Sequence, residues 1–435
     1  MMSQLTLFWF RRDLRVHDNV GFYHALKGSE KVLPVFIFDA HIIDKLPQKD
    51  ARIELILQAL GYINDAMKGN QCTVGMYRGV PKAILTELLN RYPIDRVVTN
   101  RDYEPYARER DQEIASHLEA RGIAFETYKD QVIFEQDEVT KDDGKPYVVY
   151  TPYSRKWLQA FEENPPREYP SQSLLHKLFT DEALPLLDLD SLGFDPEDFN
   201  TPPFRFDDAL IDAYEETRNF PALDQTSRLG PYLRFGLVSI RDLVNQAAKR
   251  PDNTFLKELI WREFFMQILW HFPHTKDQSF KSKYDRIPWR NNEDDFQKWC
   301  VGETGYPLVD AGMRQLNQTG FMHNRIRMLV GSFLCKHLLI DWRWGEAYFA
   351  EKLLDYEMAS NVGNWQWVAG SGVDAAPYFR IFNPTEQIKK FDKQHAYIQK
   401  WVPEYQELSY PQPIVDHKLA RARCLEVYKT ALDSV

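Results

Sequence analysis

The strongest constraint on the fold is a change of hydrophobic pattern along this 435-residue chain. Over the first 130 or so residues, short apolar runs alternate with amphipathic stretches such as Ala51–Met67 and Pro81–Arg91. The runs are rich in Val, Ile, Phe and Tyr, which favour β-strands. Strands that alternate with helices predict βαβ units and a parallel sheet. The strand-like runs are Leu5–Phe10, Val32–Phe38, Thr73–Tyr77, Arg96–Asn100 and Phe125–Tyr128.

The strand signal nearly vanishes from about residue 201 onward, where long amphipathic segments indicate helices. These segments are Phe255–Trp270, Pro307–Asn317, His323–Leu339 and Trp344–Asp355. Residues 131–200 are acidic and contain prolines that break the pattern, with a helix expected near Tyr153–Phe161. We therefore predict an α/β domain with a Rossmann-like parallel sheet over 1–130, a connector over 131–200 and an all-α domain over 201–435.

The charge balance neither supports nor excludes nucleic-acid binding. The net charge is −9, but residues 1–200 hold 24 Lys and Arg against 33 Asp and Glu, whereas residues 201–435 hold 30 of each. A neutral second half can still present a basic face, because phosphate contact depends on local Lys and Arg.

The cellular setting is predicted from what the chain lacks. Its four cysteines are isolated, so neither a disulfide framework nor a metal site is indicated. The apolar run Leu5–Phe10 is too short for a signal peptide, and no run approaches the roughly 18 residues that span a bilayer. We expect a cytoplasmic protein with no membrane segment.

Three segments of the second half carry candidate functional residues. The first is Thr226-Ser227-Arg228-Leu229-Gly230, followed by Pro231, which has the character of a helix start. Free N–H groups at such a start favour a phosphate, although a plain helix cap is the commoner meaning of this pattern.

The second segment is one helix in which Glu258, Trp261 and Arg262 share a face with Phe265. A helix buried in a core would not place Glu and Arg on its inner stripe. The pattern indicates either a binding site or an exposed ion pair beside a half-buried Trp, and spacing alone does not separate the two.

The third segment has two parts. Asn324, Arg327 and Met328 share one helix face, while Arg325 points elsewhere, in a direction that suits a phosphate. Residues 361–367, Asn-Val-Gly-Asn-Trp-Gln-Trp, are expected to form a Gly-broken loop. Its amides suit hydrogen bonds to a planar heterocycle, and its rings suit stacking on a base.

Together these motifs resemble the photolyase–cryptochrome family, and most closely its bacterial class I enzymes that act on cyclobutane pyrimidine dimers. The resemblance covers nearly the whole chain in the right order. The matching segments are Trp9–Asn19, Thr226–Leu233, Glu258–Phe264, Gly305–Arg314, Asn361–Trp367 and Asp374–Pro384.

The resemblance implies that FAD binds in the helical domain, which agrees with the absence of a GxGxxG motif after the first strand. Bacterial relatives commonly carry Asp-x-Asp where this chain has Asp355-Tyr356-Glu357, so the longer Glu357 is a departure. Around the flavin the resemblance places Arg327 with Asp355, Glu357 near the ribose or ring edge and Asn361 beside N5. The other implied FAD residues are Tyr214, Thr226, Ser227, Arg228, Leu229 and Gly230 at the diphosphate, together with Phe255 and Glu258.

The implied reaction is light-driven repair, in which excited reduced FAD gives one electron to a pyrimidine dimer flipped out of DNA. Glu258 and Asn324 would bond the pyrimidine edges and Met328 would make apolar contact. Trp261 and Trp367 would form the aromatic wall, and Arg218, Arg325, Arg380 and Gln387 would contact the DNA. Trp365, Trp342 and Trp289 match a chain that carries electrons to the flavin.

Other functions compete with dimer repair. Enzymes for the (6-4) photoproduct carry two His where this chain has Asn324 and Met328, which supply no acid–base group. A cryptochrome photoreceptor is the main alternative, although Asn361 and the absence of a long C-terminal tail favour repair. A light-independent flavin oxidoreductase would need a nicotinamide site, which is not visible. A plain DNA-binding module would not need the Asn- and Trp-rich segment.

The resemblance also implies UV-damaged DNA as the partner, a monomeric state and a possible second antenna chromophore. Folate-binding relatives carry Asn-Glu a few residues after a Tyr-Glu pair, whereas Tyr103-Glu104 is followed here by Pro105-Tyr106-Ala107. The antenna, whether folate or deazaflavin, therefore stays unidentified.

Overall fold

The structure is a computed structural model that describes residues 5–196, 201–250 and 254–433. The outer ends of the predicted domains and the last four residues of the predicted connector, 197–200, lie outside this description. Contacts between Cα atoms divide the chain into two compact units. Unit 1 comprises residues 1–138, 158–201 and 230–249, and unit 2 comprises residues 139–157, 202–229 and 250–435.

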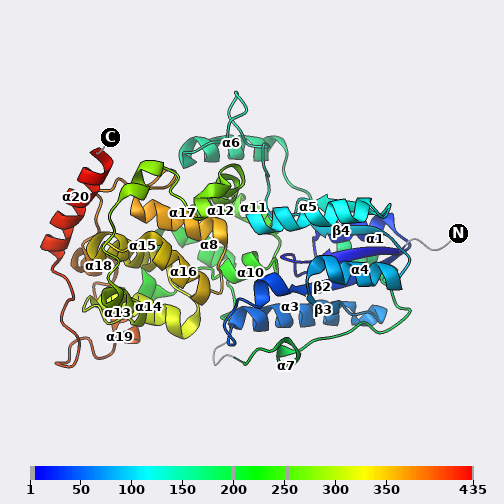
Figure 1. Cartoon of the computed structure of the whole chain (residues 1–435), viewed down its shortest axis with the longest axis horizontal. Coiled ribbons are helices and arrows are strands. Elements are labelled where there is room, and N and C mark those ends of the chain that lie inside the picture. The colour runs from blue at the N-terminus through cyan, green and yellow to red at the C-terminus, as the bar shows by residue number, and fades with distance from the viewer. Residues whose placement is uncertain (1–4, 197–200, 251–253, 434–435) are drawn as a thin grey trace. The chain divides into compact units, whose positions relative to one another are not determined.

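Unit 1 is built on a five-stranded sheet with the order β3-β2-β1-β4-β5 (Figure 1). Every neighbouring pair is parallel, with Phe8 of the central strand opposite Pro34 on one side and Val98 on the other. The predicted parallel sheet and its Rossmann-like character are thus confirmed. The strands are β1 (Leu5–Phe10), β2 (Lys31–Asp39), β3 (Gly75–Gly79), β4 (Ile94–Asn100) and β5 (Ala124–Tyr128).

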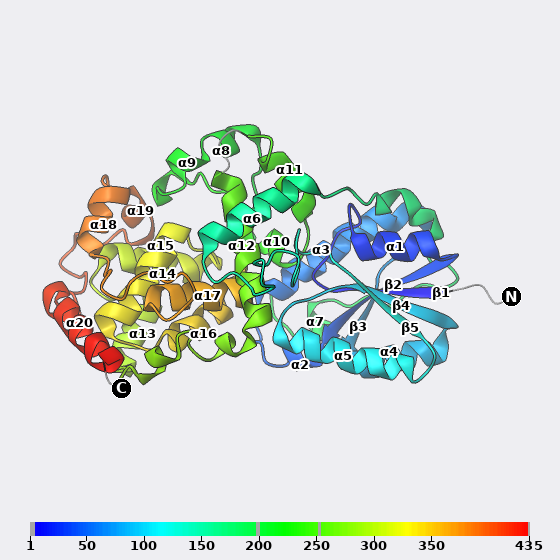
Figure 2. The same ribbon diagram turned by 90° about the horizontal axis from the view of Figure 1, so that it is seen from above.

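Helices cover both faces of this sheet, because its strands are apolar on both sides. Figure 2 shows α1 (Val20–Gly28) on one side and α4 (Pro81–Arg91) with α5 (Pro105–Glu119) on the other. The side chains of α1 and α3 (Ala51–Met67) join one buried cluster with Phe8 and Phe10. Leu85 and Leu88 of α4 join the opposite cluster with Trp9.

Buried charges tie a later segment into unit 1. The Arg241 guanidinium, on α11 (Ile240–Ala247), donates to the carboxylates of Asp18 and Asp130 over 2.9 Å each. Arg15 donates to Asp130 over 2.8 and 2.9 Å. All four side chains are at most 7% exposed. This closed network explains why α11 belongs with the sheet although it lies far along the sequence.

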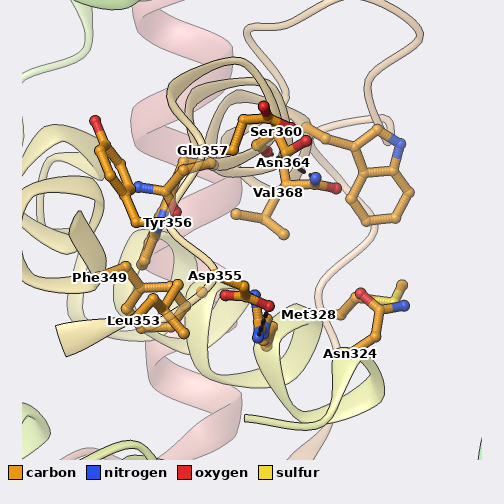
Figure 3. Close-up of a pocket in the computed structure, with 15 residues that line it drawn as sticks. Asn324, Met328, Phe349, Leu353, Asp355, Tyr356, Glu357, Ser360, Asn364 and Val368 are labelled. Atoms are coloured by element: carbon orange, nitrogen blue, oxygen red, sulfur yellow. Dashed lines mark hydrogen bonds and ion pairs between the residues drawn. The ribbon is translucent and has the colours of Figure 1, made fainter. Parts of the chain in front are cut away.

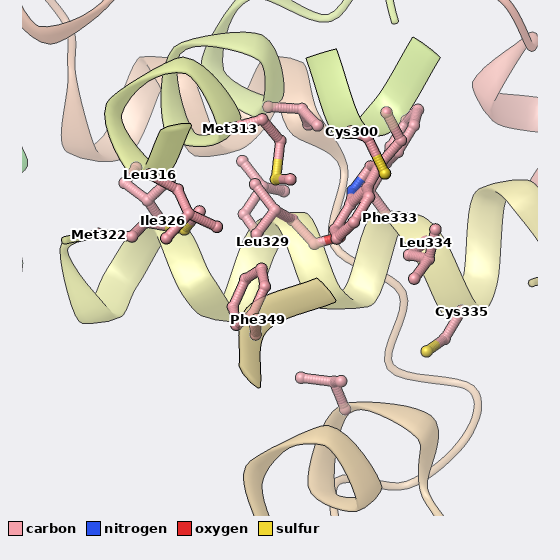
Figure 4. Packing of buried hydrophobic residues seen from close by; sticks show 14 of the residues in the cluster. Cys300, Met313, Leu316, Met322, Ile326, Leu329, Phe333, Leu334, Cys335 and Phe349 are labelled. Carbon is pink, nitrogen blue, oxygen red and sulfur yellow. The ribbon is translucent and has the colours of Figure 1, made fainter. Parts of the chain in front are cut away.

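Unit 2 is helical, and no strand occurs among its described residues. Its core gathers residues such as Met313, Ile326, Leu329 and Phe333, which Figure 4 shows packed around one helical run. The all-α prediction for the second half is therefore confirmed. The helices from α12 onward are α12 (Thr254–His271), α13 (Glu293–Val301), α14 (Pro307–Thr319), α15 (Asn324–Ser332), α16 (Trp342–Lys352), α17 (Met358–Ala369), α18 (Pro384–Phe391), α19 (Ala396–Trp401) and α20 (His417–Asp433).

Shorter helices complete the two units. The helix expected near Tyr153–Phe161 is present as α6 (Tyr150–Glu163). The predicted boundaries at 130 and 200 stay predictions, and the contacts group residues 131–201 and 230–249 in a more interleaved way. The remaining short helices are α2 (Ala40–Ile43), α7 (Leu189–Leu192), α8 (Asp208–Asp212), α9 (Tyr214–Thr217) and α10 (Gly230–Arg234).

One local expectation is refined and one is wrong. The segment His323–Leu339 is helical as predicted, although α15 ends at Ser332 and a π-helical turn, η6 (Phe333–Leu338), continues it. The expected loop at Asn361–Trp367 is instead the middle of α17. Glycine is a poor helix former, but close packing of α17 on α12 requires it at position 363. A Cβ there would lie 2.3 Å from the Phe265 ring.

Candidate active site

A pocket in unit 2 lies among α15, α16, α17 and the segment between the last two helices. It encloses about 620 Å³ of empty space, part of which is open to solvent. Figure 3 shows Asn324 and Met328 side by side at one edge, with Ser360 and Asn364 on another helix across the space. The lining residues are Asn324, Arg327, Met328, Gly331, Phe349, Leu353, Asp355, Tyr356, Glu357, Ser360, Asn361, Asn364, Trp365, Trp367 and Val368.

An ion pair fixes one wall of the pocket. Arg327 donates to both carboxylate oxygens of Asp355, over 3.1 and 2.8 Å. The Arg327 Nε also donates to the Met322 carbonyl over 2.7 Å, so the planar guanidinium is held at three points. The sequence paired these two residues by resemblance, and the structure brings them into contact.

A second polar contact holds Asn361. Its amide Nδ2 donates to the backbone carbonyl of Glu346 over 3.1 Å and to the Glu346 carboxylate over 2.9 Å. These bonds turn the amide nitrogen toward α16. Burial raises the pKa of Glu346, which favours the protonated carboxyl group there.

Glu346 was missed at the sequence level. The available signal was its spacing, because it lies three residues before the buried Phe349 and beside Gly345 on the inner face of α16. Glu346 itself does not line the pocket. The lining residues that sequence reasoning did not assign are Gly331, Phe349, Leu353, Tyr356, Ser360, Asn364 and Val368.

Glu357 faces a cation from a different helix. Its carboxylate lies 3.3 Å from the Arg262 Nε, and its side chain is 6% exposed. Arg262 was expected to share a face of α12 with Glu258 and Trp261. Of these three residues, Arg262 contacts a residue of the pocket wall, Glu357. The aromatic residues Trp365 and Trp367 also line the pocket, and Trp365 is buried.

A second group of predicted residues gathers around the start of α12. The Arg218 guanidinium forms an ion pair with the Glu258 carboxylate. Tyr214 packs edge-on against Phe255, with 4.9 Å between ring centroids. Trp261 is stacked on Tyr150 at 3.6 Å, so one face of its ring is already covered.

The other predicted residues lie outside the pocket lining. Arg325, on α15, lies 4.4 Å from the centre of the Phe391 ring. Arg380 is exposed and Gln387 is half-buried on α18. The segment Thr226, Ser227, Arg228, Leu229 and Gly230 leads into α10, and its Arg228 pairs with Asp224.

The three tryptophans predicted for electron transfer contact one hydrophobic cluster. Trp342 and Trp365 are members of the cluster and are 1% and 3% exposed, whereas the half-buried Trp289 packs against it. Within the described residues, no ring contact joins the three directly. Their proposed role stays a prediction.

The pocket suits the flavin of FAD. Apolar walls from Phe349, Leu353 and Val368 alternate with a few fixed polar groups, as in small-molecule sites. A planar heterocycle needs such walls for its faces and donors or acceptors for its edge. Arg327, Asp355 and Asn361 supply these donors and acceptors.

Comparison with known proteins places the chain in a family. Residues 6–171 match DNA photolyase, and residues 255–409 match the FAD binding domain of DNA photolyase. The deoxyribodipyrimidine photo-lyase of Synechococcus sp. is 36% identical over 98% of this chain and 97% of its own length. That of Escherichia coli is 35% identical over 98% of each. The chain belongs to the photolyase–cryptochrome family, and its second half carries the family's FAD-binding domain.

Solved structures agree with this assignment. A bacterial class III photolyase from Agrobacterium tumefaciens is 33% identical, has a TM-score of 0.89 and covers 99% of this chain, with 98% of its own length matched. An archaeal photolyase from Sulfolobus tokodaii with two FAD molecules has a TM-score of 0.83 at 32% identity and covers 98% of this chain, with all of its own length matched. Because a class III enzyme is among the similar structures, assignment to class I stays a prediction. Over its described residues, this chain has no helix both long and apolar enough to cross a bilayer.

Proposed function

We propose that this protein is a deoxyribodipyrimidine photo-lyase, which repairs cyclobutane pyrimidine dimers in UV-damaged DNA under blue light. The observation that carries the proposal is the pocket, which gathers the predicted flavin residues Arg327, Asp355 and Asn361 with the predicted substrate residues Asn324 and Met328. Its support is a chain 35–37% identical to deoxyribodipyrimidine photo-lyases over nearly its full length.

FAD, when bound and reduced, supplies the excited-state electron that opens the cyclobutane ring. Arg327 and Asp355 would hold the cofactor's edge, and Asn361, whose amide nitrogen is bonded to Glu346, would offer its amide oxygen. At the open side, Asn324 bonds a pyrimidine edge while Met328 and Trp367 cover its apolar surface. The reaction needs no general acid or base, which agrees with Asn and Met at these positions.

The cryptochrome alternative has weaker support. A cyanobacterial cryptochrome from Synechocystis sp. matches with a TM-score of 0.82, but its 24% identity speaks for the fold alone. The curated relatives at 31–37% identity are deoxyribodipyrimidine photo-lyases. A retained Asn361 at the pocket wall also favours repair.

The deciding experiment uses the FAD-loaded, reduced protein and DNA that carries thymine dimers. Blue light should restore the thymine absorbance band, and the same mixture kept dark should not change. Asn324→Ala should weaken binding of dimer DNA while FAD stays bound, whereas the control Asn245→Ala, which changes an amide bonded to the Pro166 carbonyl, should not. Illumination without recovery, with FAD present, would favour a photoreceptor.

Three finer statements belong to the same proposal. The protein acts as a monomer in the cytoplasm. A second chromophore, folate, deazaflavin or another flavin, serves as antenna. The Sulfolobus tokodaii enzyme, whose second FAD is described as a light-harvesting cofactor, supports the last statement. Extraction of the purified protein and chromatography of the released chromophores would identify the antenna.

A further inference from the structure

Two arginines from different segments lie close to one another in unit 2. Arg218 follows α9 directly and forms an ion pair with Glu258 of α12. The next residue, Asn219, accepts a hydrogen bond from Arg325 at the start of α15. Neighbouring residues of one segment therefore engage Glu258 on one side and Arg325 on the other.

The two guanidinium groups are unequally neutralised. Arg218 has the carboxylate of Glu258 and, at 4.0 Å, that of Glu215. Arg325 has only neutral partners among the described residues, namely Asn219, the Met328 sulfur at 3.7 Å and the Phe391 ring. Burial, followed by the charge of Arg218, lowers the pKa of Arg325, which shows that the two cations affect one another.

Both arginines also retain an unused donor. The Nε atoms of Arg218 and Arg325 are buried and make no hydrogen bond within the described part of the chain. Two neighbouring cations favour an anion that both can bind, and guanidinium groups suit phosphate in particular. A backbone phosphate of DNA is the anion that the proposed function brings to this surface.

Glu258 then has two incompatible partners. Its carboxylate is bonded to Arg218 in this structure, yet the proposed function requires it to accept hydrogen bonds from a pyrimidine edge. Its side chain is 36% exposed and that of Arg218 is 30% exposed, so neither is locked in place by packing.

We propose that Arg218 and Glu258 form a substrate-operated exchange, an inference that rests on the proposed function. A DNA phosphate displaces Glu258 from Arg218, and the freed carboxylate turns to the N–H groups of the flipped dimer. With a dimer present, every charged group regains a partner. On undamaged DNA no flipped base arrives, so Glu258 would be left unpaired, and it therefore holds Arg218 back from the phosphate.

The exchange predicts opposite effects of one substitution on two DNAs. In the dark, Glu258→Gln should bind undamaged DNA about two- to fivefold more tightly, the size expected for a half-exposed ion pair. Its affinity for DNA with a single thymine dimer should fall. The dependence of undamaged-DNA affinity on salt should steepen by about one phosphate contact, because Arg218 becomes available.

A matched control separates the exchange from a simple loss of negative charge. Glu215→Gln removes a carboxylate near the same guanidinium, but that carboxylate is 57% exposed and lies 4.0 Å away. This variant should leave the ratio of dimer to undamaged affinity unchanged. A drop in that ratio equal to the drop in Glu258→Gln would overturn the proposal.

A double-mutant cycle completes the test. In an Arg218→Gln background, Glu258→Gln should no longer raise affinity for undamaged DNA, because the group that Glu258 restrains is gone. A rise that persists there, or no rise in the single variant, would overturn the exchange. When the parent protein prefers dimer DNA and repairs it, a contradictory result from these variants overturns the exchange alone. A parent protein that neither prefers nor repairs dimer DNA overturns the proposed function.

Discussion

The polar groups of the two units are used in opposite ways. In unit 1, Arg15, Asp18, Asp130 and Arg241 are buried and pair with one another, so the network is closed. In unit 2, Arg327 and Asp355 also pair, but they line a pocket with open space beside them. The first network therefore holds the chain together, whereas the second is arranged for another molecule to bind.

The largest effect should come from opening the closed network. Arg241→Leu leaves Asp18, which is fully buried, without a cation, and should lower the free energy of unfolding by about 3–5 kcal/mol. Denaturant unfolding measures this loss. The control Arg91→Leu breaks an ion pair with Glu182 that is 56% and 38% exposed, and should cost less than about 1 kcal/mol. Equal losses would contradict the distinction.

The next largest effect should come from acid, which should destabilise unit 2 at a higher pH than unit 1. Burial lowers the pKa of His323 to about 4 and of His337 to about 3, so the unfolded chain binds these protons first. Unit 2 should therefore lose about 3–5 kcal/mol per histidine as pH falls from about 6.5 toward those values. In unit 1, burial alone would raise the pKa of Asp130, but nearby arginines hold it low. The contribution of this carboxylate to the stability of unit 1 is therefore lost only below about pH 3.8.

Hydrogen exchange measured across this pH range distinguishes the two units. His323→Asn keeps a side-chain acceptor for the Arg325 N–H at the start of α15 but removes the titrating ring. It should flatten the loss of protection in unit 2 between pH 6.5 and 4. Loss of protection in unit 1 at a higher pH than in unit 2 would contradict the prediction that the buried histidines make unit 2 the more acid-sensitive unit.

Breaking the open pair should affect binding more than folding. Arg327→Gln removes a guanidinium whose side chain is 25% exposed and leaves Asp355 facing the pocket. The charged hydrogen bonds that Arg327 would give to the cofactor amount to about 1.5–3 kcal/mol, and their loss should appear as weaker FAD retention. The ratio of FAD to protein after gel filtration measures it. Unchanged retention would mean that this pair does not hold the cofactor.

The smallest effects should come from two helical glycines. Gly363→Ala places a methyl group against Phe265 and should destabilise unit 2 by about 1–3 kcal/mol, observed as a lower melting temperature. Gly61→Ala, on α3 of unit 1, meets nothing within 4 Å and should stabilise the protein by up to about 1 kcal/mol. The same substitution would then have opposite signs in the two units.

Much of the fold could be predicted because local patterns and tertiary packing agree. Ala51–Met67 and Pro81–Arg91 form helices over the predicted residues, since the apolar spacing and the Pro at the start of the second match the structure. The exception is 361–367, where Asn and Gly are poor helix formers. There, packing of Gly363 against Phe265 overrides propensity.

The candidate site was only partly accessible to sequence reasoning. Resemblance paired Arg327 with Asp355, and the structure brings them together. The partner of Asn361 could not be predicted, because Glu346 lies on a different helix and no local spacing connects them. Nor could spacing predict that Glu258 pairs with Arg218, forty residues earlier in the chain.

The π-helical turn at Phe333–Leu338 has a consequence for the register of this region. Such a turn is equivalent to an α-helix into which a single residue has been inserted. It therefore offsets the end of the run at Leu338 by roughly a quarter-turn relative to Asn324 and Met328, before the left-handed Leu339 ends the run. Deleting one residue between 333 and 338 should restore a regular helix and rotate the residues that follow on this run up to Leu338. In an alignment, a relative without this turn should show a one-residue gap there.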